Sequence, residues 1–69
     1  MSSVYKVIEL VGTSHESWEK AAAAAVEQAS KSLRDLRIAE VLKLDMKVEN
    51  GKVAAYRARI NVSFKYKDT

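Results

Sequence analysis

The side chains of this 69-residue chain that can carry out chemistry are mainly carboxylates and bases, because it holds one histidine, His15, and no cysteine. Few groups therefore titrate near neutral pH, and disulfides and thiolate metal sites are excluded. His15 has Ser14 and Glu16 beside it in sequence, but residues one apart on a helix do not face each other, so no catalytic triad is supported. We interpret His15 as a surface residue and expect no enzymatic activity.

Four carboxylates are candidates for holding a cation: Glu16, Glu19, Asp45 and Glu49. Calcium takes about six to eight oxygen ligands, and no stretch here resembles the loop of a calcium hand. A site within one chain is therefore not expected. In a closed symmetric oligomer, one such residue near a three-fold axis is repeated three times and forms a cluster of oxygens. The plainer interpretation of each residue is a solvated surface carboxylate.

Basic residues form a strip on the polar face of the last two predicted strands. Its members are Lys43, Lys47, Arg57, Arg59 and Lys65. The plainer interpretation is a solvated face or salt bridges to Asp45 and Glu49, and the functional one is an anion site at an interface. Nucleic acid is the least favoured partner, because 12 basic against 9 acidic residues is a weak excess and the strip lacks exposed aromatic side chains.

The first half of the chain predicts a strand followed by a helix. Residues 4–11 are rich in β-branched and aromatic side chains, and Gly12 ends the run. Thr13 and Glu16 fit a capping box at the start of a helix from residue 14 to about 35, a stretch without Gly or Pro. The apolar stripe of this helix comprises Trp18, Ala22, Ala25, Val26, Ala29, Leu33 and Leu36. Trp18 is expected to anchor the core or an interface, and the alanines allow close packing on a sheet.

The second half predicts two strands, because apolar residues alternate over 42–48 and again over 54–66. Paired residues must share a face, so we predict a three-residue loop, Glu49-Asn50-Gly51, with a bulge. This register pairs Met46 with Ala54, Leu44 with Tyr56, Lys43 with Arg57 and Asp45 with Ala55. It leaves two alternatives for Glu40: a buried, paired carboxylate near Ile60, or a bulge near Ala39 that turns Glu40 outward and moves Ile38 to the polar face.

The predicted fold is α+β, with a three-stranded antiparallel sheet covered on one face by one helix. The last strand would span about 45 Å, whereas a 20-residue helix covers about 30 Å, so part of the sheet has no cover. Phe64 and Tyr66 lie on this overhang. A chain this small buries only about 60% of its unfolded surface, and both observations predict a homo-oligomer. No run of residues is long and apolar enough to span a membrane, and we expect a cytoplasmic protein.

The sequence resembles the dodecin family over nearly its whole length, so residues 1–69 are taken as a single dodecin-like domain. The matching parts are residues 4–14 (Val-Tyr-Lys-Val-Ile-Glu-Leu-Val-Gly-Thr-Ser), an alanine-rich helix, and Glu49-Asn50-Gly51-Lys52-Val53 before the last strand. The resemblance implies a β-α-β-β subunit assembled into a hollow homododecamer. It also implies storage of riboflavin or FMN in interface pockets, without catalysis.

The resemblance also implies four ligand-binding positions, which are Ile38, Asp45, Arg57 and Lys65. Ile38 replaces the tryptophan that stacks on the flavin in typical members, and isoleucine has no aromatic face. Arg57 replaces a glutamine and Asp45 a basic residue, whereas Lys65 keeps its charge. The tract at residues 14–22 and Leu44-Asp45-Met46 are more similar to a calcium dodecin branch. We therefore predict binding of calcium or another ion, with Asp45 as first choice, ahead of flavin; an anion or nucleic-acid module is a distant alternative.

Overall fold

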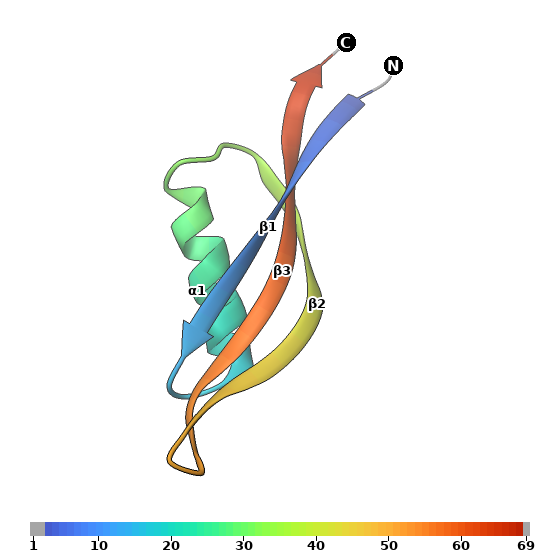
Figure 1. The fold of residues 1–69 in the computed structure, drawn as a ribbon. Coiled ribbons are helices and arrows are strands. Elements are labelled where there is room, and N and C mark those ends of the chain that lie inside the picture. Colours follow the sequence, from blue (N-terminus) through green and yellow to red (C-terminus); the bar gives the residue numbers. More distant parts are fainter. Residues whose placement is uncertain (1–2, 69) are drawn as a thin grey trace.

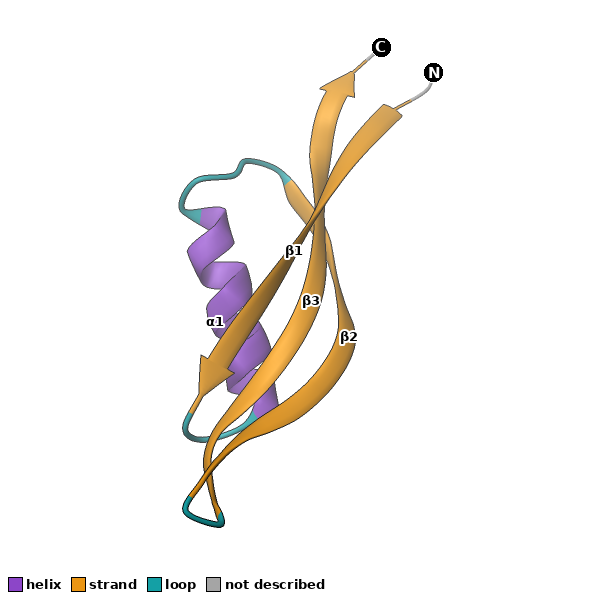
Figure 2. Ribbon diagram, viewed as in Figure 1, coloured by secondary structure: helices purple, strands orange, loops and turns teal. Residues whose placement is uncertain are grey.

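The computed structural model describes residues 3–68, with the side chains of residues 3–66. The elements follow in the order β1 (Ser3–Ser14), α1 (Trp18–Ser30), β2 (Leu36–Glu49) and β3 (Lys52–Asp68). Both sheet pairings are antiparallel, and β3 lies between β1 and β2. Figures 1 and 2 show α1 along one side of this sheet. The predicted α+β fold with the order β-α-β-β is confirmed.

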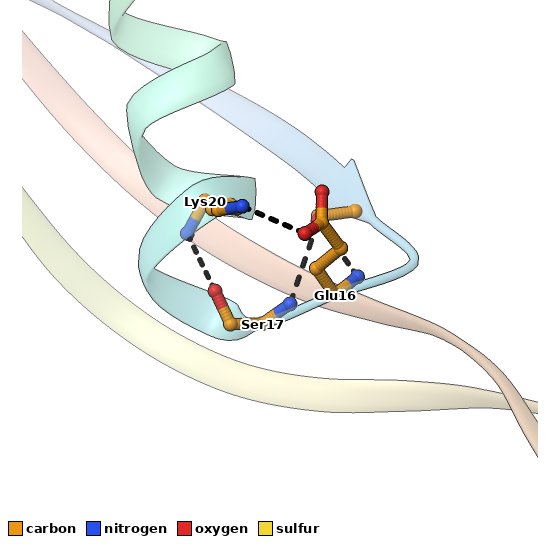
Figure 3. Close-up of polar contacts among 4 residues, drawn as sticks. Glu16, Ser17 and Lys20 are labelled. Carbon is orange, nitrogen blue, oxygen red and sulfur yellow. Dashed lines mark hydrogen bonds and ion pairs between the residues drawn. The ribbon is translucent and has the colours of Figure 1, made fainter.

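The helix begins four residues later than predicted, and the capping box of Thr13 and Glu16 is wrong. Residues 13 and 14 still pair with β3, so the chain is extended there. Ser17 is the N-cap instead, and its Oγ accepts a hydrogen bond from the backbone N–H of Lys20 at 3.1 Å. The Glu16 carboxylate turns to the Lys20 ammonium at 2.7 Å (Figure 3).

The helix also ends earlier than predicted, at Ser30 rather than near residue 35. The backbone N–H groups of residues 31–33 donate to the carbonyls of Gln28 and Ala29, which closes the last turn. Asp35 then takes a positive φ of 59°, a left-handed conformation that helices do not continue through. Leu36, predicted on the helix, begins β2. In the part of the chain that the structure describes, no helix is long and apolar enough to cross a membrane.

Small residues hold the helix close to β1. Ala21, Ala25 and Ala29 are its buried residues. A Cβ atom added to Gly12 would lie 2.0 Å from the backbone oxygen of Ala21, a distance that no side chain tolerates. The approach of α1 to β1 therefore requires glycine at position 12.

The core lies where α1 meets the central strand. Ala58, Ile60 and Val62 of β3 are buried against Ala21 and Ala25. The molecule is 53 Å long, whereas 13 helical residues cover about 20 Å. Figure 1 shows the ends of β1 and β3 extending past the helix, and Tyr66 on this overhang is 63% exposed. The predicted uncovered part of the sheet is confirmed.

The hairpin differs from the prediction, since its loop has two residues and not three. Glu49 pairs with Lys52, and Asn50 and Gly51 have φ values of 52° and 74°, as in a type I′ turn. A bulge at Ala54 then shifts the register by one residue. The predicted cross-strand pairs are therefore wrong by two residues on β3. The observed partners are Met46 with Tyr56, Leu44 with Ala58, Lys43 with Arg59 and Asp45 with Arg57.

A second bulge at Leu42 decides the orientation of Glu40. It lies between the pairs of Val41 with Ile60 and of Lys43 with Arg59, so the side chains before it change faces. Glu40 pairs with Asn61 and is exposed. The outward alternative for Glu40 is confirmed, including the move of Ile38 to the polar face, although the bulge lies three residues beyond the predicted place.

Candidate ligand-binding face

The face of the sheet that α1 does not cover carries charged side chains from all three strands, and we call it the open face. The register assigns to it the charged residues Glu9 on β1, Glu40, Lys43, Asp45, Lys47 and Glu49 on β2, and Arg57, Arg59 and Lys65 on β3. None of the charged side chains that the structure describes is buried. A molecule or ion bound on the open face would therefore be held by charge and hydrogen bonds, and not enclosed in an apolar cavity.

Asp45 and Arg57 form a bidentate ion pair on this face. Arg57 Nε donates to Asp45 Oδ1 at 2.7 Å, and Arg57 Nη2 donates to Asp45 Oδ2 at 2.9 Å. The two residues are direct cross-strand partners, and their side chains are 50% and 42% exposed. The hydrogen bonds from Arg57 hold the pKa of Asp45 below its ordinary value, and the nearby charge of Arg59 adds to this. Asp45 is thus an ionised carboxylate in a fixed orientation.

Two further ion pairs lie on the open face. Arg59 Nη1 lies 2.6 Å from Glu9 Oε2, and Lys47 Nζ lies 3.3 Å from Glu49 Oε2. Salt bridges of the basic strip to Asp45 and Glu49 are therefore confirmed. The partner of Arg59 was missed by the sequence analysis, because the register between the first and last strands, which brings Glu9 near, was not predicted.

Trp18 ties the helix to the backbone of Asp45. Its indole Nε1–H donates to the backbone oxygen of Asp45 at 3.0 Å, on the edge strand β2. Its ring packs edge-on against Tyr56, with centroids 5.1 Å apart and an angle of 71° between the rings. Trp18 therefore links α1 to the sheet beside the buried cluster and not within it, and its role at an interface stays a prediction. Its link to Asp45 depends on a strand register that was not predicted.

The four positions implied by the resemblance fall into two groups. Asp45 and Arg57 touch, whereas Ile38 lies opposite Ser63 and close along β3 to Lys65. Six residues separate Arg57 from Ser63, which corresponds to roughly 20 Å along a strand. Ile38 is 67% exposed. Within one chain the structure therefore brings together one pair and not a four-residue site.

The four cation candidates do not meet within one chain either. Glu16 pairs with Lys20, Glu49 pairs with Lys47, and Glu19 lies in the first turn of α1. Across residues 3–66, no group of three or more potential metal-ligating side chains is present. His15 is exposed, as predicted, and its Nδ1 lies 2.9 Å from the Ala54 carbonyl oxygen at the bulge. Two of the four candidates belong to the open face: Asp45, paired with Arg57, and Glu49, paired with Lys47 beside the hairpin.

Two shallow clefts flank the helix, and both are mainly apolar. The larger, of about 290 Å³, lies between α1 and β1 and includes Leu10, Gln28 and Leu33. The smaller, of about 230 Å³, lies between α1 and the start of β2 and includes Ile38. Arg37 is a charged residue that lines the smaller cleft, whereas Asp45, Arg57 and Lys65 line neither. These three candidate positions therefore lie on the open sheet and not in the clefts.

The fold and this face define a small subunit with one helix on a long, partly uncovered sheet. The sequence profile described as Dodecin matches residues 4–67. Calcium dodecin of Mycobacterium tuberculosis is 51% identical over 63 residues, which cover 91% of this chain and 89% of that protein. Dodecin of Thermus thermophilus is 39% identical over 69 residues and covers both chains fully. The chain belongs to the dodecin family.

The crystal structure of the Mycobacterium tuberculosis protein has the same fold. It superimposes with a TM-score of 0.84 at 50% identity, covering 97% of this chain and 96% of that one. That protein is described as a calcium-chelating antigen with a novel calcium-binding site.

Proposed function

We propose that this chain is the subunit of a hollow homododecamer that binds and sequesters calcium or a similar cation, with Asp45 as the principal protein ligand. The observation that carries the proposal is the placement of Asp45. It is an ionised, half-exposed carboxylate whose backbone is held by Trp18 and whose side chain is held by Arg57. The relative that is half identical to this chain chelates calcium, which favours calcium over other cations. The proposed role is binding, without catalysis.

Self-association is supported by the apolar surface that one chain leaves uncovered. Apolar side chains on β2 and β3 are about half exposed although they belong to the helix side of the sheet. They include Val41, Leu44, Met46 and Tyr66. β1 and β2 are both edge strands, and such surfaces are normally buried against another chain. Neighbouring copies would supply the missing cover.

The residues of one chain offer the type of ligand that calcium prefers. They reach the number of ligands that calcium needs only when several copies contribute. Carboxylate oxygens are the ligands that calcium prefers, and Asp45 presents two of them on an exposed strand. Within the described residues, one chain gathers no group of three or more potential metal ligands. Copies related by a symmetry axis would each contribute an Asp45, and Glu16, Glu19 and Glu49 remain the other proposed ligands.

The residues at the flavin-equivalent positions fit a flavin poorly. Ile38 offers no aromatic face for stacking, and Arg57 and Asp45 use their polar atoms on each other. Lys65 alone keeps a charge suited to a phosphate. Flavin storage is therefore ranked second, and riboflavin is included in the test as the competing ligand.

Light scattering coupled to gel filtration, followed by thermal unfolding with calcium or with a chelator, tests the proposal. A twelve-fold mass is expected, with a melting temperature that rises on addition of calcium and falls with the chelator, because a ligand of the folded state stabilises it. The fluorescence of added riboflavin should not be quenched. A folded monomer, or quenching of riboflavin with no response to calcium, would refute the proposal. A cytoplasmic location is part of the proposal and is tested by cell fractionation.

A further inference from the structure

The Asp45 carboxylate, on which the proposed function rests, is already paired with a cationic side chain. Each oxygen of Asp45 accepts one hydrogen bond from Arg57, at 2.7 and 2.9 Å. A bidentate guanidinium matches a carboxylate in both charge and shape. Arg57 thus occupies two of the roughly four lone-pair sites of the carboxylate, so a calcium ion that binds Asp45 competes with Arg57 for the same two oxygens and is repelled by its charge.

We propose that Arg57 is an internal counter-ion that competes with metal for Asp45 and so sets the cation affinity of the open face. This inference rests on the proposed function, because it concerns the regulation of the same site. With no metal, Arg57 neutralises Asp45 and keeps it oriented. When a divalent cation arrives, its larger charge displaces the guanidinium, which swings away on a flexible side chain.

The geometry permits this exchange without a change in the fold. The side chains of Arg57 and Asp45 are 42% and 50% exposed, so neither is enclosed by packing. The backbone at Asp45 is held independently by the indole of Trp18. The strand backbone at Asp45 therefore stays in place when Arg57 leaves, and only exposed side chains have to move.

Arg59 provides a matched comparison on the same strand and face. It carries the same charge two residues further along β3, but its guanidinium is bound to Glu9 at 2.6 Å. If only the positive charge of the face mattered, Arg57 and Arg59 would weaken calcium binding alike. Since direct contact with Asp45 matters in this proposal, Arg57 should dominate.

The experiment measures calcium affinity by isothermal titration calorimetry for the intact chain and the variants Arg57→Gln and Arg59→Gln, all first treated with chelator. Removing Arg57 should tighten calcium binding about fivefold, because this factor in affinity corresponds to the free energy that one exposed ion pair contributes. Removing Arg59 should change it about twofold or less, through screened charge alone. The double variant Asp45→Asn with Arg57→Gln should show no gain over Asp45→Asn.

Several outcomes would overturn the inference. Equal gains in calcium affinity in the two arginine variants would show that only net charge matters. An unchanged or weaker affinity in Arg57→Gln would show that Arg57 does not compete with calcium for Asp45. If no variant binds calcium, the inference and the proposed function both fail. If only Arg57→Gln binds calcium, the competition stands and the proposed function of the natural chain fails. Should Arg57→Gln not fold, Arg57→Lys keeps the charge without the bidentate geometry and should give a smaller gain in the same direction.

A second readout needs no calcium. Thermal unfolding of the chain, Asp45→Asn, Arg57→Gln and the double variant, all in chelator, forms a double-mutant cycle. The two single variants should lower the melting temperature by more, when summed, than the double variant does. Additive effects would show that the pair is not formed in solution and would contradict the competition.

Discussion

The two faces of β3 differ sharply although their residues alternate along one strand. On the helix side, Ile60 and Val62 are at most 1% exposed and pack against small residues of α1. On the open side, Arg57 and Arg59 are about 40% exposed and bind carboxylates of the two flanking strands. Burial stabilises in proportion to the area removed from water, whereas exposed ion pairs contribute little. One face therefore holds the fold, and the other is free to carry ligand chemistry.

The largest loss in the free energy of unfolding is expected from Ile60→Ala, on the helix side of β3. Deleting a fully buried isoleucine removes its transfer free energy and leaves a cavity, at a cost of about 2–5 kcal/mol. Asn61→Ala, at the next residue on the open face, should cost about 0.5 kcal/mol or less. Both free energies of unfolding are measured by denaturant titration at one protein concentration. Similar losses in the two variants would contradict the division of roles.

A somewhat smaller loss is expected from Gly12→Ala, which tests the close packing of α1 on β1. The added Cβ would lie 2.0 Å from the Ala21 oxygen, so the helix must shift, at a cost of about 1–3 kcal/mol. Val11→Ala changes the adjacent residue, whose side chain is 45% exposed, and serves as the control. A Gly12→Ala protein as stable as the unmodified chain would show that the helix is held less closely than described.

Trp18→Phe should cost about 1 kcal/mol, because it removes the indole N–H that donates to the Asp45 carbonyl while keeping an aromatic ring. Its melting temperature, measured by circular dichroism, should fall by more than that of Tyr56→Phe, which keeps the ring packed against Trp18. Equal effects would indicate that the aromatic contact matters and the hydrogen bond does not.

The smallest effect on stability is expected from Asp45→Asn, and it should depend on pH. Arg57 lowers the pKa of Asp45 in the folded chain, so this pair stabilises the protein above the ordinary pKa near 3.8 and is lost as the pH falls through the lowered folded value. Between pH 6 and 2.5, the melting temperature of Asp45→Asn should therefore fall less than that of the unmodified chain. Parallel curves would mean that the carboxylate gains nothing from Arg57.

The sequence predicted the elements and the two faces better than it predicted contacts between strands. Alternation over 54–66 marks Ile60 and Val62 as one face and Arg57 and Arg59 as the other, and this holds in the structure. The hairpin register failed because the loop is one residue shorter than predicted and because the bulge at Ala54 leaves no mark in the pattern. Each shifts the register by one residue, and together they move the partner of Asp45 from Ala55 to Arg57. The helix start failed because Thr13 and Ser17 are both suitable caps, and only the pairing of Thr13 with β3 decides between them.

Calcium titration of the chelator-treated protein and of Asp45→Asn, by isothermal titration calorimetry, tests the central claim that the open face binds a cation through Asp45. The intact chain should give saturable binding, and Asp45→Asn should weaken it about tenfold or more while keeping the same oligomeric mass, because a neutral amide replaces the charged ligand. Binding that is absent from the intact chain, or equally tight in the two proteins, would contradict the account.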